Sequence, residues 1–72
     1  MNGMYEIFVF SYNGEVPQVR TSHKLYGKHY ATKTAKEIGK CDNVLRVEMI
    51  DATTGELLLT IEDGETAWEA MY

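Results

Sequence analysis

The sequence has little of several residue types that constrain small proteins. Among its 72 residues there are one cysteine, one proline and one tryptophan. A single cysteine excludes an intramolecular disulfide and is typical of a reducing compartment. No apolar run is long enough to cross a bilayer, and the first residues lack the charged start and apolar core of a secretory signal. We therefore expect one soluble, cytoplasmic domain over residues 1–72, with no membrane contact. Within it, residues 63–72 are either part of the fold or a mobile tail.

Residues with recognisable chemistry are equally sparse. Cys41, His23 and His29 are the only soft metal ligands, and they lack the paired spacing of a structural zinc site. The glycines are scattered at turns, and none forms a phosphate-binding loop after a strand. We expect no catalytic residue, metal, cofactor or small-molecule ligand, and we expect that the protein is not an enzyme.

The clearest pattern is a β-hairpin over residues 44–62. Two apolar runs flank a loop, Thr53–Gly55, whose glycine suits the left-handed position of a three-residue hairpin turn. The spacing predicts that Ala52 faces Glu56 and that Arg46 faces Glu62. One face then carries the apolar side chains, and a slip by one residue would move them to the wrong side. The apolar face comprises Leu45, Val47, Met49, Leu57, Leu59 and Ile61.

A second hairpin is expected near the N-terminus. Residues 4–12 are rich in aromatic and β-branched residues, and Asn13-Gly14 is a strong signal for a two-residue turn. This turn predicts that Tyr12 faces Glu15. Because proline cannot donate to a ladder, Pro17 indicates that the second strand is an edge. Residues 22–27 are expected to be a connector.

Residues 28–40 have the spacing of a helix. Ala31, Thr34, Ala35 and Ile38 share one side, and Gly39 marks the expected end. The apolar side is mostly small, so the helix can lie close to a sheet. Residues 63–72 favour a short helical turn, in which Trp68 and Met71 point the same way.

These elements predict an α+β fold of order ββαββ. One helix packs on one face of a four-stranded, mainly antiparallel sheet of order 2-1-3-4. The alternative order, 2-1-4-3, requires a parallel central pair. A short C-terminal helical turn completes the expected fold.

Charge is distributed unevenly along the chain. Residues 16–41 hold six bases and only one acid, whereas residues 42–72 hold eight acids and only Arg46. Lys33, Lys36 and Lys40 share one side of the expected helix, where they can contact phosphates, and Tyr26 and Tyr30 can add stacking. This pattern is the basis of an alternative function, nucleic-acid contact. Two observations oppose it: the pI is near 5.0, and lysines are common on the outer face of a helix in any soluble domain.

The first functional hypothesis is protein–protein contact by a small accessory protein, with a partner or a second copy. If Phe8 and Phe10 face the helix, the side chains that alternate with them form an apolar patch on the other sheet face, and such patches mark interaction sites. The expected contact residues are Tyr5, Ile7, Val9, Trp68 and Tyr72. A third hypothesis is that the acidic half acts as a decoy for a nucleic-acid-binding protein.

Overall fold

The computed structural model describes residues 3–13 and 16–70. In this part of the chain, five strands and one helix follow one another along the sequence. They are β1 (Met4–Asn13), β2 (Val16–Tyr26), α1 (Lys28–Gly39), β3 (Val44–Asp51), β4 (Leu57–Glu62) and β5 (Glu65–Glu69).

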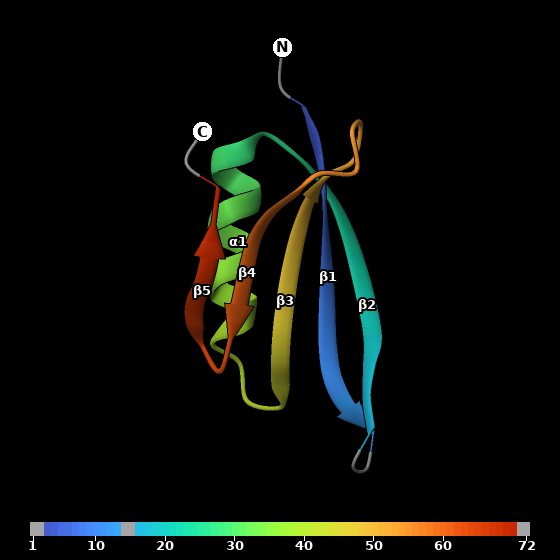
Figure 1. The fold of residues 1–72 in the computed structure, drawn as a ribbon, viewed down its shortest axis with the longest axis vertical. Coiled ribbons are helices and arrows are strands. Elements are labelled where there is room, and N and C mark those ends of the chain that lie inside the picture. Colours follow the sequence, from blue (N-terminus) through green and yellow to red (C-terminus); the bar gives the residue numbers. More distant parts are fainter. Residues whose placement is uncertain (1–2, 14–15, 71–72) are drawn as a thin grey trace.

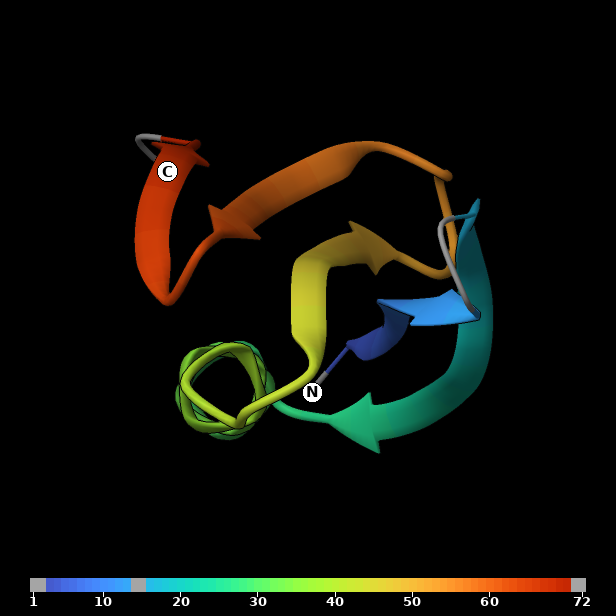
Figure 2. The same ribbon diagram turned by 90° about the horizontal axis from the view of Figure 1, so that it is seen from below.

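The strands form one sheet in the order β2-β1-β3-β4-β5, and every neighbouring pair is antiparallel (Figure 1). The expected order 2-1-3-4 is confirmed, and the alternative with a parallel central pair is excluded. Figure 2, an end-on view, shows α1 beside one face of the twisted sheet, with β5 on one flank and the end of β2 on the other. The α+β class is therefore correct, but the sheet has one strand more than expected.

The β3–β4 hairpin largely has the expected register. Arg46 faces Glu62 and Met49 faces Leu59, but a bulge then places Ile50 opposite Leu57 instead of Leu58. At the turn, Gly55 has a φ of 79° and donates its N–H to the Asp51 carbonyl at 2.7 Å. The left-handed glycine and the alternating apolar pattern together fix this hairpin.

The N-terminal hairpin is paired differently from the prediction. Tyr12 faces Pro17 instead of Glu15, and a further shift occurs between Val9 and Phe10. The predicted register was wrong by two residues from Phe10 to the turn, and by three residues at Val9, beyond the shift. Gly14, half of the predicted turn, lies outside the described residues.

The predicted connector, residues 22–27, is mostly strand. β2 continues to Tyr26 and pairs with β1 as far as Met4. Pro17 does lie in an edge strand, as expected. Gly27, with a φ of 88°, then turns the chain into α1 and donates its N–H to the Gly3 carbonyl at 3.0 Å.

The helix occupies 28–39, close to the predicted 28–40. It has no side-chain N-cap and no acid in its first turn, so packing on the sheet supplies its stability rather than local signals. Ala31 and Ala35 are fully buried, and Gly39 lies against Ile61. The buried apolar core of the described residues comprises Ile7, Val9, Ala31, Ala35, Val47, Met49, Leu58, Leu59 and Ile61.

The expected C-terminal helical turn is instead strand β5. Asp63 and Gly64 both have positive φ, 54° and 81°, and Glu62 pairs with Glu65 across them. Asp-Gly with two left-handed residues is a favoured two-residue hairpin turn. This signal was present in the sequence and was missed, because short acidic and small residues after it favoured a helical reading.

Candidate functional surfaces

The structure divides the predicted protein-contact residues among different environments. Ile7 is fully buried and Val9 is 6% exposed, and both belong to the core, while half-buried Tyr5 packs against it. Ile7 lies opposite Met49, whose sulfur is contacted by the helix residue Thr32. The odd-numbered side of β1 therefore faces α1, and the predicted orientation was wrong.

The reason lies in the composition of β1. Both of its faces carry large apolar side chains, so the strand by itself does not reveal which face meets the helix. Pairing with β3 decides the matter, because Val9 lies opposite Val47 and Ile7 opposite Met49. Phe8 and Phe10 are half-buried on the face away from α1.

Trp68 remains as an exposed member of that predicted set. It lies on β5 opposite Thr60 and is 49% exposed. β5 ends the sheet on this side, and all five of its residues are exposed. Tyr72 and Met71 lie outside the described residues. The result is one half-exposed indole on a strand that has a sheet neighbour on one side only.

The surroundings of Trp68 are acidic. Glu65 and Glu69 lie on the same strand, and Glu62 and Asp63 precede them in exposed positions. Opposite charges attract a partner before contact, so such a rim favours a basic one. Short length and charged residues also protect an edge strand from non-specific pairing.

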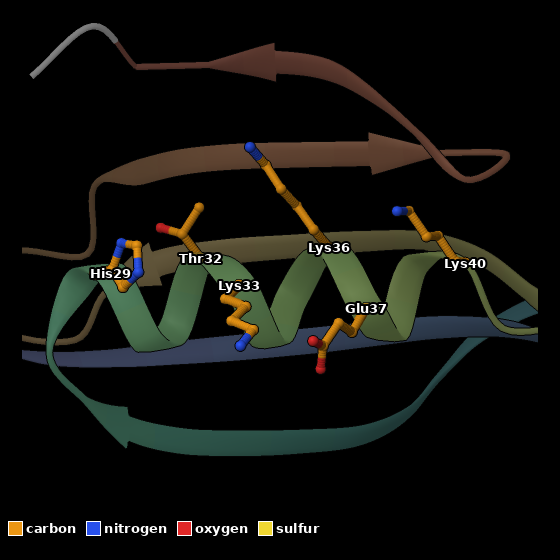
Figure 3. Close-up of a pocket in the computed structure, with 6 residues that line it drawn as sticks. All are labelled: His29, Thr32, Lys33, Lys36, Glu37 and Lys40. Carbon is orange, nitrogen blue, oxygen red and sulfur yellow. The ribbon is translucent and has the colours of Figure 1, made fainter.

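The predicted lysines do come together. Lys33, Lys36 and Lys40 line one groove of about 410 Å³ on the outer side of α1. The groove lining is completed by His29, Thr32 and Glu37. Figure 3 shows Lys36 and Lys40 on the side of the helix nearer β4 and β5, whereas Lys33 and Glu37 extend toward the side of β2. Helical spacing in the sequence was sufficient to find this surface.

An acid from the sheet reaches the groove. Lys36 Nζ lies 3.5 Å from Glu69 Oε1, and the two side chains are 43% and 44% exposed. This contact joins the middle of the helix to the last strand. It partly neutralises the lysine row, and sequence spacing gave no signal for it because the two residues are far apart in the chain.

Two tyrosines of the basic segment, residues 16–41, are strongly exposed. Tyr26, at the end of β2, is 66% exposed, and Tyr30, in the first turn of α1, is 59% exposed. Aromatic faces next to cationic side chains are the combination used for binding single-stranded nucleic acid. Both tyrosines were named in the nucleic-acid hypothesis as residues that can add stacking, and their exposure leaves them available for it.

Arg46 forms the other charge cluster of the described residues. Its Nε donates to Glu48 Oε2 at 2.8 Å, and its Nη1 donates to Glu62 Oε1, which confirms the expected Arg46–Glu62 ion pair. Surface pairs of this kind contribute roughly 0–1 kcal/mol. Arg46 and Glu48 lie on β3 and Glu62 lies on β4, so the cluster links two neighbouring strands and pairs Arg46 with acids of the protein itself.

Residues with metal or thiol chemistry are dispersed. Cys41 is exposed just after α1, and His23 and His29 are exposed on β2 and α1. Within residues 3–13 and 16–70, no three His, Cys, Asp or Glu side chains are grouped so that they could hold a metal ion. The same part of the chain has no helix with the length and apolarity needed to span a membrane.

Comparison with known proteins adds no relative. The chain matches no protein-family model, no curated protein and no solved structure.

Proposed function

We propose that this chain is a small, non-enzymatic binding protein that contacts another protein through strand β5 and Trp68. The observation that carries the proposal is the half-exposed indole on the last strand of the sheet. Burying a tryptophan is among the largest single contributions to a protein interface. An edge strand also offers free backbone donors and acceptors to an added strand.

The occupant that fits this edge is an extended, basic segment of a partner protein. The added strand would hydrogen-bond to β5 and cover Trp68, while its lysines or arginines would meet Glu65 and the nearby acids. The charge of residues 42–72, eight acids against one base, supports this choice over an acidic partner. A second copy of the chain carries the same acidic edge, so edge-to-edge pairing between copies would bring like charges together.

Fluorescence of Trp68 tests the proposal, because this is the only tryptophan in the chain. The probe is a short peptide with alternating lysine and valine, and its control has glutamate in place of lysine. We expect the basic peptide to shift Trp68 emission to shorter wavelength, in a manner weakened by salt. Equal responses to the two peptides, or none, would reject the basic partner.

A matched pair of variants locates the binding. Glu65→Lys reverses a charge on β5 and is expected to weaken binding of the basic peptide about three- to tenfold. Glu56→Lys makes the same change in the exposed β3–β4 loop and is expected to leave affinity nearly unchanged. Sedimentation of the protein alone at micromolar concentration tests whether it forms a dimer. A dimer that buries Trp68 would identify a second copy as the occupant of β5 and would overturn the choice of a basic partner.

A second candidate function is nucleic-acid contact through the outer side of α1. It is favoured by the grouping of Lys33, Lys36 and Lys40 in one groove, and by the exposure of Tyr26 and Tyr30 in the same basic segment of the chain. An electrophoretic shift with single-stranded DNA or RNA at low and moderate salt tests it. We expect salt-sensitive binding that is lost when Lys33 and Lys36 are changed to glutamate. Lys24→Glu, on β2, is the control, and absence of a shift at low salt would reject this candidate.

A further inference from the structure

The groove on α1 contains cations whose spacing suits one anionic group. Lys36 and Lys40 are one helical turn apart, so their side chains are neighbours on the helix surface. Both lie on the side of the helix nearer β4 and β5, as does the Thr32 side chain (Figure 3). Ammonium groups on flexible stems bind phosphate as point charges and need no fixed orientation.

One anion is already present at this position, and it belongs to the protein. The Glu69 carboxylate lies 3.5 Å from the Nζ of Lys36, which is one of the lysines that line the groove. Both side chains are more than two-fifths exposed, so water screens their attraction and the pair is weak. An incoming anion can therefore take the place of Glu69 at little cost.

From this geometry we infer that the groove binds a phosphate group between Lys36 and Lys40, and that Glu69 of β5 is the internal competitor for Lys36. The inference rests on the second candidate function, since it concerns the same groove, and it adds the regulation of that site. The shared chemistry is the phosphate group, whether it belongs to inorganic phosphate compounds or to a nucleic-acid backbone. In the resting protein, Glu69 keeps the site partly neutral and lowers its affinity.

If Glu69 competes with phosphate for Lys36, removing the charge of Glu69 should strengthen phosphate binding. Glu69→Gln keeps the side-chain shape and removes the competing charge. We expect it to tighten phosphate binding about two- to fivefold, the range set by an exposed ion pair. Glu65→Gln removes the same charge from the same strand, but at a residue that, unlike Glu69, forms no ion pair with Lys36. It is expected to change affinity by less than about 1.5-fold, because an exposed charge at a distance is screened.

The measurement is a titration of backbone amide NMR signals at low salt with inorganic pyrophosphate, and separately with a short oligothymidylate. The spectra of the two variants also show directly that each is folded. In the wild type we expect the largest shifts at residues 29–40. Similar affinity per phosphate for the two probes would assign the site to free phosphate compounds, whereas much tighter, strongly salt-dependent binding of the oligonucleotide would assign it to a nucleic-acid backbone.

The outcomes separate the inference from the function on which it rests. Binding at the helix with equal affinity in the wild type and Glu69→Gln would overturn the competition and leave the nucleic-acid candidate standing. Equal tightening by Glu69→Gln and Glu65→Gln would also overturn it, because the effect would then be one of overall charge. Absence of shifts at 29–40 with both probes, in every variant, would overturn the inference and the nucleic-acid candidate together.

Discussion

At the scale of single residues, the approach of helix to sheet depends on small side chains. Ala31, Ala35 and Gly39 are the buried residues of α1. A Cβ atom added at Gly39 would lie 2.6 Å from the Cγ2 of Ile61, too close for any carbon pair. The helix is closed after Gly39 by hydrogen bonds from Lys40 and Cys41 to carbonyls of its last turn. The role of this glycine is therefore close packing rather than a left-handed cap.

Gly39→Ala is expected to destabilise the protein by about 1–3 kcal/mol, because the methyl group overpacks the contact with Ile61. In an open helix, the same change would stabilise by up to about 1 kcal/mol, so the sign of the effect is diagnostic. Denaturant-induced unfolding measures it.

The control is the double variant Gly39→Ala with Ile61→Ala. Removing the Ile61 side chain creates space for the new methyl group, so the two costs should be clearly less than additive. Additive costs, or a stabilised Gly39→Ala protein, would contradict the packing role of Gly39.

At the scale of elements, β5 is attached to the fold by few interactions. It pairs with β4, Ala70 after it donates its N–H to the Leu58 carbonyl at 2.8 Å, and Glu69 pairs with Lys36. None of its five residues is buried. β3, in contrast, has a neighbour on each side and contributes Val47 and Met49 to the core. Local stability follows buried contacts, so the two strands should differ.

Hydrogen exchange of backbone amides is expected to rank the strands. Amides of β5 that bond to β4 should exchange faster than those that join β3 to its two neighbours, because β5 can open without exposing the core. Exchange followed by NMR at neutral pH measures this directly. Equal protection of β5 and β3 would show that the last strand opens only with the whole molecule.

At the scale of the whole molecule, stability depends on one small core. A chain of 72 residues has on the order of 4–10 kcal/mol of unfolding free energy in total. Leu59 is fully buried in the centre of this core, between β3 and β5. The loss of one such side chain is therefore comparable with the stability of the entire fold.

Leu59→Ala is expected to cost about 2–5 kcal/mol and to leave a measurable fraction of the protein unfolded at 37 °C. Leu57→Ala is the matched control, since Leu57 is on the same strand but 36% exposed, and its cost should be about 1 kcal/mol or less. Thermal and denaturant unfolding followed by circular dichroism compare the two. Similar losses for both variants would show that the buried Leu59 contributes no more to stability than the exposed Leu57.

Several features could be predicted from the sequence because neighbouring residues specify them. Alternating apolar residues and Gly55 define the β3–β4 register from Arg46 to Met49. Helical spacing defines α1 and places Lys33, Lys36 and Lys40 on its outer side. Each of these patterns excludes its alternative, because a shift by one residue would bury a charge or expose the core.

Other features could not be predicted from local pattern alone. β1 is apolar on both faces, so its sequence fits either orientation, and pairing of Ile7 with Met49 was needed to choose one. Residues 65–69 have no strong preference of their own; Asp63-Gly64 marks a turn before them, but pairing with the edge of β4 makes them a strand. The contact of Lys36 with Glu69 follows from that recruitment.

Residue periodicity alone specifies the hairpin 44–62 and the helix with its row of lysines, because each pattern separates buried from exposed side chains in one way. Which side of β1 is buried, and the contact of an acid on β5 with Lys36, depend instead on how distant segments pack together. The physical reason is that side-chain alternation is a local property, whereas burial and charge pairing depend on which distant segment lies alongside.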